Sequence, residues 1–229
     1  MKLFKPTKSN NGALLAVNFV AKADAYEAGK VKQRGDKSVY FSFVAQNGWD
    51  DKNGNGIFKD GRRCNIKFND IEAAAIIAAV RANKTMADVM NVKMVYHDGD
   101  NSATVINFGP KIKKIKNAQG QWIETGEQQG FVMSITKTDK TNPANKENYG
   151  LGFTYAESER LVSYLNTALS HINDALFSEE IKRVQTFAAA QNVPKTAPKA
   201  AAKEEYLPSE PEEAVVDEPA PSEEELDTW

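Results

Sequence analysis

Cysteine, histidine and long apolar runs are scarce in this 229-residue chain, and each scarcity argues against a class of protein. Cys64 is the single cysteine, so no intramolecular disulfide can form and a reducing compartment is expected. One cysteine with two histidines, His97 and His171, does not supply the ligand cluster of a zinc site. No apolar run approaches the roughly 18 residues of a membrane span, and the charged first residues lack the apolar region of a signal peptide. We expect a cytoplasmic protein that needs neither metal nor cofactor and contacts no membrane.

Motifs of the common catalytic sites are missing as well. The sequence has no Walker loop, no Gly-x-Gly-x-x-Gly fingerprint, no His-Glu-x-x-His pair and no Gly-x-Ser-x-Gly nucleophile elbow. Asp98 and Asp100 form a carboxylate pair, but the sequence Asp-Gly-Asp-Asn is typical of a turn. We therefore expect no enzymatic activity and assign no catalytic residue.

The segment from Asp51 to Arg62 resembles a calcium-binding loop but lacks its strongest ligand. Asp51, Asn53 and Asn55 occupy the first, third and fifth positions of such a loop. The last position, where a bidentate glutamate binds the ion, is Arg62, whose charge would repel a cation. We interpret the segment as a flexible Asn/Gly turn between two strands.

The charges of the chain are divided between two different segments. All 29 basic residues and 20 of the 31 acidic residues precede residue 204, so residues 1–203 carry a net charge of +9. Residues 204–229 hold the other eleven acidic residues, four prolines and no basic residue. Because this tail has few apolar groups to offset the entropy of ordering, it is predicted to be disordered beyond an Ala/Pro/Lys linker at 188–203. The asymmetry indicates a nucleic-acid surface together with an interaction tail.

Hydrophobic periodicity predicts two similar rounds of strands, each followed by a helix. Val39, Phe41 and Phe43 alternate with less apolar residues, as expected for a strand with one buried face. Each helix is predicted to begin at a capping box, in which an N-cap side chain and a glutamate three residues later satisfy backbone N–H groups. The two boxes are Asn69–Glu72 and Thr154–Glu157. Residues 1–12 are polar and are expected to be loose.

An offset of 85 residues aligns the two strand-to-helix junctions. Ile66–Glu72 falls on Leu151–Glu157, and the apolar positions of the two helices follow the same alignment. We predict an α+β fold of two similar halves, 13–84 and 91–177, each made of antiparallel strands followed by a helix. The alternative architecture is an OB-fold-like β-barrel with helices.

Binding to a single strand requires cations that follow the phosphates and flat rings on which bases stack. Basic residues cluster before the first helix and again between residues 111 and 116, and several aromatic residues lie on or beside predicted strands. Taken alone, a lysine of this kind is more often a solvated surface residue, and an aromatic residue is more often packed in the core. Their coincidence with a net charge of +9 favours binding for the group as a whole. The predicted nucleic-acid-binding residues are Tyr40, Trp49, Phe58, Lys59, Arg62, Arg63, Lys67, Lys111, Lys113, Lys114, Lys116 and Trp122.

Two resemblances refine this reading. The final residues place a hydrophobic tip on a run of negative charge, which resembles the tails of bacterial and bacteriophage single-stranded-DNA-binding proteins; they are Glu223, Glu224, Glu225, Leu226, Asp227, Thr228 and Trp229. The element order over residues 13–177 is similar to that of the whirly family of single-stranded-DNA binders and of the related transcriptional-coactivator-type domain. The Lys-Gly-Lys-Ala-Ala motif of plant whirly proteins is absent, so no individual contact is carried over.

The resemblances imply a bacteriophage protein of DNA replication, recombination or repair, which would act in the host-cell cytoplasm. Residues 1–187 would bind single-stranded DNA through strand faces and edges with little sequence preference. The tail would recruit a polymerase, helicase, primase or recombinase and compete with DNA for the basic surface. The alternative is an acidic-tailed interaction protein or transcription cofactor that mimics nucleic acid and binds no DNA itself. The sequence leaves open whether the long second helix packs inside the body or joins subunits in a homodimer or higher oligomer.

Overall fold

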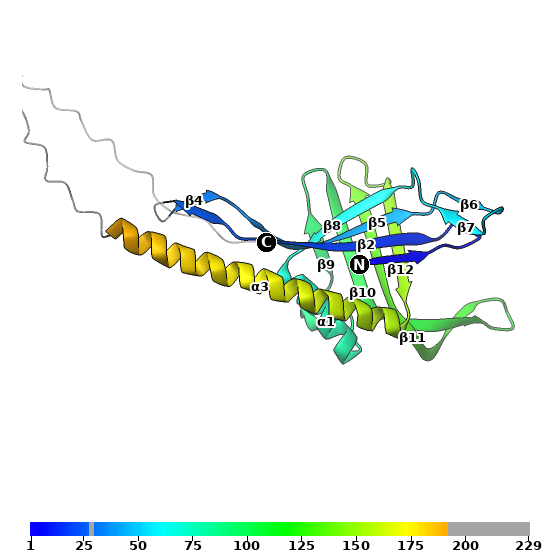
Figure 1. The fold of residues 1–229 in the computed structure, drawn as a ribbon. Coiled ribbons are helices and arrows are strands. Elements are labelled where there is room, and N and C mark those ends of the chain that lie inside the picture. Colours follow the sequence, from blue (N-terminus) through cyan, green and yellow to red (C-terminus); the bar gives the residue numbers. More distant parts are fainter. Residues whose placement is uncertain (28–29, 192–229) are drawn as a thin grey trace, which may run out of the picture. The chain divides into compact units, whose positions relative to one another are not determined.

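The computed structural model describes residues 1–27 and 30–191 (Figure 1). Most of the described strands belong to two antiparallel sheets of four strands each. In spatial order the first sheet contains β1 (Lys2–Lys5), β2 (Ala13–Lys22), β5 (Asp36–Ala45) and β8 (Arg63–Phe68). The second contains β12 (Lys146–Phe153), β11 (Trp122–Asp139), β10 (Ser102–Lys116) and β9 (Val95–Asp98). The remaining elements are the hairpins β3 (Ala25–Glu27)/β4 (Lys30–Gln33) and β6 (Gly48–Asp50)/β7 (Asn55–Ile57), and the helices α1 (Asp70–Ala82), α2 (Met86–Val89) and α3 (Tyr155–Gln191).

Each sheet is followed in the chain by a helix, which confirms the predicted α+β class with two similar halves. Both predicted capping boxes are present, because Asn69 Oδ1 accepts the Glu72 N–H at 2.8 Å and Thr154 Oγ1 accepts the Glu157 N–H at 3.3 Å. Neither sheet pairs with the other in the described part of the chain, so the structure does not show the alternative OB-fold-like barrel.

Alternate residues of each strand face a common apolar core. Val39, Phe41 and Phe43 of β5 are fully buried, as their spacing predicted. The ring of Phe41 meets that of Phe68 in β8 edge to face, with 4.8 Å between centroids. Burial of each such side chain stabilises the fold by about 1.5–3 kcal/mol. The helices α1 and α3 pack against each other and complete the core.

Tyr149 of β12 links the two halves. Its hydroxyl lies 3.3 Å from the backbone oxygen of Arg63 in β8 and 2.9 Å from Glu147 Oε2. Burial, followed by the nearby Glu147 carboxylate, raises the pKa of Tyr149 to about 12. The hydroxyl therefore stays protonated at neutral pH and can donate a hydrogen bond.

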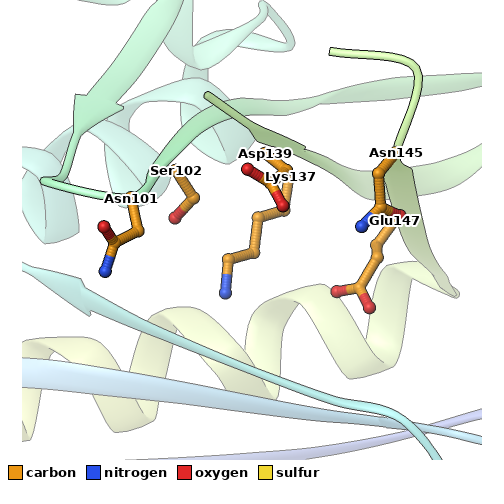
Figure 2. Close-up of a pocket in the computed structure, with 6 residues that line it drawn as sticks. All are labelled: Asn101, Ser102, Lys137, Asp139, Asn145 and Glu147. Atoms are coloured by element: carbon orange, nitrogen blue, oxygen red, sulfur yellow. The ribbon is translucent and has the colours of Figure 1, made fainter. Parts of the chain in front are cut away.

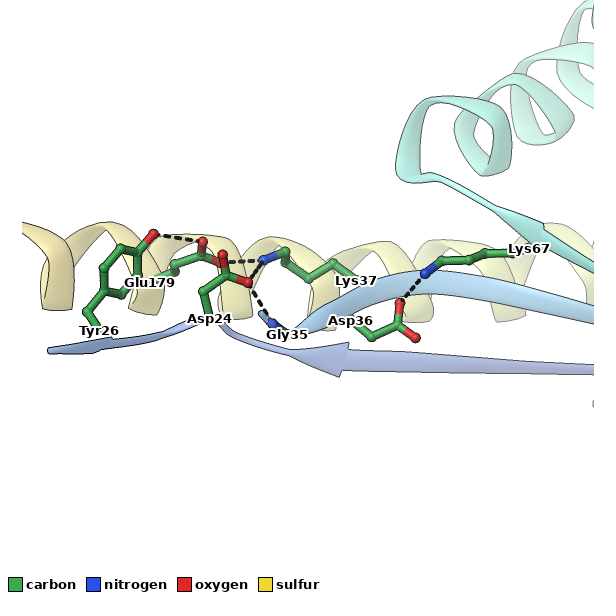
Figure 3. Close-up of polar contacts among 7 residues, drawn as sticks. All are labelled: Asp24, Tyr26, Gly35, Asp36, Lys37, Lys67 and Glu179. Carbon is green, nitrogen blue, oxygen red and sulfur yellow. Dashed lines mark hydrogen bonds and ion pairs between the residues drawn. The ribbon is translucent and has the colours of Figure 1, made fainter. Parts of the chain in front are cut away.

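Hairpin β3/β4 is held against α3 by a polar network (Figure 3). Lys37 Nζ lies 3.0 Å from Asp24 Oδ1 and 2.6 Å from Glu179 Oε2, and Tyr26 donates to Glu179 Oε1 at 3.1 Å. Glu179 lies in the last third of α3, so the network connects the distal part of this helix to the first half. The helix α3 continues without a break through Ile181 and Val184.

The expectation that residues 1–12 are loose is wrong. Residues 2–5 form β1, which pairs with β2 along its whole length. The following loop is fixed by the buried side chain of Gln46, which accepts the Thr7 N–H at 2.9 Å. The same amide donates to the backbone oxygens of Thr7 and Gly48, at 2.9 and 2.7 Å. One buried amide thus holds the β1–β2 loop beside hairpin β6/β7.

The strands β10 and β11 continue beyond the second sheet as a two-stranded arm, residues 111–128 (Figure 1). The register shifts between Pro110 and Ile112, at the root of the arm. On the opposite strand Gly130 has a φ of +116°, a conformation available to glycine but costly for other residues. The strip Lys111–Lys116 is therefore one strand of a projecting hairpin. Residues 192–203 of the predicted linker and the predicted disordered tail lie outside the described residues.

Candidate nucleic-acid interface

The face of the first sheet that points away from the core carries rings and cations, and we call it the platform. The strand register places its residues in three rows that cross the sheet. The rows are Phe4–Leu14–Val44–Arg63, Lys2–Ala16–Ser42–Asn65 and Asn18–Tyr40–Lys67. Three cations therefore border a partly apolar surface, a combination suited to an unpaired strand.

Phe4 and Phe58 form the aromatic part of the platform. The two ring centroids lie 6.1 Å apart with the planes at 76°, an edge-to-face contact. Phe4 is 57% exposed although its strand neighbour Leu3 is buried. The face of an exposed ring is available to another flat molecule, and stacking a base on it would remove apolar surface from water.

Tyr40 and Lys67 are direct cross-strand neighbours, and Asp36 connects them. Lys67 Nζ lies 5.8 Å from the centre of the Tyr40 ring and 3.0 Å from Asp36 Oδ1 (Figure 3), and the Tyr40 hydroxyl donates to the same carboxylate. The hydrogen bond from Tyr40, supported by that from Lys67, lowers the pKa of Asp36, and the reciprocal effect raises the pKa of Tyr40. The lysine charge is thus partly balanced, while its orientation over the ring is fixed.

The arm carries the second predicted group of residues, but two of its lysines are neutralised. Lys113 pairs with Glu127 at 2.8 Å and Lys114 pairs with Glu124 at 3.0 Å, both across the hairpin. Lys116 lies 5.3 Å from the centre of the Trp122 ring, and that indole is 65% exposed. The arm therefore offers one lysine–indole pair at its end, with a lower net charge than its lysine count suggests.

The predicted residues fall into three places. Tyr40, Phe58, Arg63 and Lys67 come together at the platform. The residues on the arm are Lys111, Lys113, Lys114, Lys116 and Trp122. Trp49 is half-buried in β6, and the exposed Lys59 and Arg62 lie between β7 and β8. The predicted partner-binding residues of the tail, Glu223–Trp229, lie outside the described residues.

Sequence reasoning missed Phe4, together with Lys2, Asn18 and Asn65 of the same face. The signal was present in Lys2–Lys5, where Leu3 points inward and Phe4 outward. A strand of four residues that begins and ends with lysine is too short for its alternation to stand out from a polar terminus.

The hollow in Figure 2 lies at the opposite end of β10 and β11 from the arm. It encloses about 230 Å³ and is lined by Lys137, two carboxylates and three short polar residues, namely Asp139, Glu147, Asn101, Ser102 and Asn145. With two negative groups to one positive group, this hollow disfavours a phosphate. In residues 1–27 and 30–191 no helix is long and apolar enough to cross a membrane, and no three metal-ligating side chains gather.

Comparison with known protein families and with curated proteins finds no match. Solved structures do match over most of the chain. WHY3 from Arabidopsis thaliana has a TM-score of 0.52 at 16% identity, covering 81% of this chain and 96% of that one. The plant transcriptional regulator PBF-2 gives 0.53 at 15% identity, with 84% and 92% covered, and WHY1 from Arabidopsis thaliana gives 0.53 at 16% with the same coverage. At such identities the likeness concerns the fold alone, and the fold of this chain is whirly-like.

Proposed function

We propose that this protein binds single-stranded DNA with little sequence preference. The observation that carries the proposal is the platform, where the exposed ring of Phe4 shares one sheet face with Arg63 and Lys67. Each stacked base contributes about 1–3 kcal/mol, and every base has a flat face, so the stacking tolerates any sequence. The cations supply the phosphate contacts that make such binding sensitive to salt.

Trp122 and Lys116 at the end of the arm provide a second contact in this proposal. The Trp122 indole is 65% exposed, so it adds little burial energy to the fold. A stacked base would cover this apolar surface. The positive charge of Lys116 beside the ring suits a nearby phosphate. The role of Trp122 follows from exposure and charge, independently of the platform.

The wider role that we propose is in DNA replication, recombination or repair, with bacteriophage as the source and the host-cell cytoplasm as the site of action. The acidic tail would recruit a replication protein, and the chain would act without catalysis. This recruiting role of the tail is supported by its charge, which is opposite to that of residues 1–203, and by the apolar residues Leu226 and Trp229 near its end. A homodimer or higher oligomer is compatible with the outward residues Phe177 and Val184 of α3, which are 70% and 56% exposed.

A salt titration on labelled oligo-dT tests the proposal. We expect tight binding at low salt, with the logarithm of the association constant falling linearly as the logarithm of salt concentration rises. Absence of binding at low salt would overturn the proposal and favour the alternative, an acidic interaction protein without DNA of its own. Competition by unlabelled mixed-sequence oligonucleotides then measures the sequence preference.

A further inference from the structure

A groove runs from the edge of β1 to the root of the arm. Its first part is a hollow of about 300 Å³ between the start of the β1–β2 loop and the edge strand β12, lined by Lys5, Thr7, Asn11, Ala13, Lys111, Gln129 and residues 150–154. A second hollow of about 490 Å³ extends along the arm to Lys114 and Glu124. Lys111 and Gln129 line both hollows, so the two adjoin at these residues.

The first hollow has a positive lining without a carboxylate. Two lysines line it, and the other polar side chains include hydroxyls and two amides, which can donate hydrogen bonds. Lys5 is already paired with Glu157 at 2.5 Å. Among the described residues Lys111 has no ion-pair partner, in contrast to Lys113 and Lys114 further along the arm. The unbalanced charge of the groove is therefore that of Lys111.

Glycines of β12 leave room for this lysine. A Cβ built on Gly152 would lie 3.2 Å from Lys111 Nζ, so the ammonium occupies the place that a side chain would take. Gly150, two residues earlier on the same face, meets only the Met133 backbone oxygen, at 3.8 Å. The floor of the groove is thus bare backbone, over which an elongated ligand can pass.

The strand β1 separates this groove from the platform. Phe4 belongs to the platform, whereas the next residue, Lys5, lines the groove. A single strand that leaves the platform at Phe4 and passes around this edge meets Lys111 and then the arm with Trp122. The groove thereby connects the two groups of candidate residues.

We propose that this groove is a phosphate-binding subsite, in which Lys111 holds a phosphodiester of the single strand as it passes from the platform to the arm. This inference rests on the proposed function and adds to it a path for the strand and a specific role for Lys111. The ligand is one backbone phosphate, and the groove reads no base. The hydroxyl of Thr7 and the amides of Asn11 and Gln129 are neighbouring hydrogen-bond donors.

The test uses the full chain and labelled oligo-dT in a salt titration. Two variants remove the charge of the subsite in different ways: Lys111→Ala deletes the ammonium, and Gly152→Asp places a carboxylate beside it. The Cβ that Gly152→Asp introduces would displace only the flexible end of Lys111, so this variant is expected to fold. The controls are Lys182→Ala, which removes an exposed lysine of α3, and Ser163→Asp, which adds the same negative charge on an exposed position of the same helix.

We expect both Lys111→Ala and Gly152→Asp to reduce the salt slope by about 0.7, the value for one phosphate of a single strand. The two controls keep the wild-type slope, and all four variants keep the wild-type unfolding midpoint. A different outcome is that the wild type binds with a steep salt slope that Lys111→Ala and Gly152→Asp leave unchanged. In that case Lys111 does not hold a phosphate, and the proposed binding of single-stranded DNA still stands. If the wild type does not bind, the proposed function itself fails.

Discussion

His97 Nε2 and Glu72 Oε1 lie 2.6 Å apart, and this contact joins β9 of the second half to α1 of the first. The second carboxylate oxygen of Glu72 accepts the Asn69 N–H at 3.0 Å, so both oxygens are used. Burial of Glu72 would by itself raise the pKa of this carboxyl group, but the hydrogen bonds from His97 and Asn69 outweigh burial and lower it below the usual 4.5. A capping residue of one half thus also connects the two halves.

We expect His97→Ala to lower the free energy of unfolding by about 1–3 kcal/mol, because a buried carboxylate loses a hydrogen-bond partner. His97→Gln retains a donor at this place and should recover part of the loss. Chemical denaturation of the three proteins at neutral pH measures the difference. Equal stability of wild type and His97→Ala would show that the contact contributes nothing to stability.

The same contact predicts how stability depends on pH. Because the pKa of Glu72 is lower in the folded than in the unfolded chain, its contribution is fully present above about pH 4.5 and is lost as the pH falls through the lowered value. Glu72→Gln removes this titration while its amide oxygen still accepts the Asn69 N–H. The difference in unfolding free energy between wild type and Glu72→Gln should therefore shrink on acidification below pH 4.5. A difference that is constant with pH would contradict the assignment.

Gly130→Ala is expected to destabilise the protein more than Gly126→Ala does. Both glycines have a positive φ, of +116° and +76°, so both substitutions carry a backbone cost of roughly 1–3 kcal/mol. Only at Gly130 would the new Cβ lie 2.1 Å from a backbone oxygen, that of Phe153, whereas no atom lies within 4 Å at Gly126. Thermal unfolding of the pair isolates the steric term at the root of the arm. Similar unfolding midpoints would show that the backbone at Gly130 can shift away from Phe153 without a loss of stability.

The starts of α1 and α3 were predictable because their determinants are local. Asn69 and Glu72, like Thr154 and Glu157, are three residues apart and satisfy each other's backbone within one turn. The alternation in β5 likewise identified its buried face. A repeated order of strands and capped helix was enough to indicate the fold class.

The candidate site depended on contacts that local patterns do not contain. Lys113 meets Glu127 fourteen residues away, through a hairpin whose register shifts twice, so the neutralisation of the arm could not be counted from the sequence. Phe4 belongs to the platform only because β2 pairs with a four-residue strand. Composition identified the kinds of residue that a single strand needs, whereas the pairing of distant strands decides which of them share a face.

Phe4→Ala should weaken binding of oligo-dT by about 5- to 150-fold, the equivalent of one lost stacked base. The side chain is 57% exposed, so the substitution is expected to change the unfolding midpoint little. Ile71→Ala, on α1 and 67% exposed, is the control and should bind as the wild type does. If both variants lose affinity equally, or neither does, the platform is not the binding surface.

Removal of the acidic tail should strengthen DNA binding. A chain that ends at Lys203 loses eleven negative charges, which compete with DNA phosphates for the basic surface if the tail reaches it. Because a tethered segment competes at an effective concentration on the order of millimolar, we expect affinity for oligo-dT to rise by roughly two- to tenfold at low salt. The gain should vanish at high salt, where screening weakens both competitors. Replacing Glu223, Glu224, Glu225 and Asp227 by their amides removes four of the eleven charges at full length. If charge rather than length causes the gain, this variant should reproduce part of it. Unchanged affinity in the truncated chain and in the amide variant would contradict the proposed competition between tail and DNA. Weaker binding would mean that the tail itself contributes to the contact with DNA.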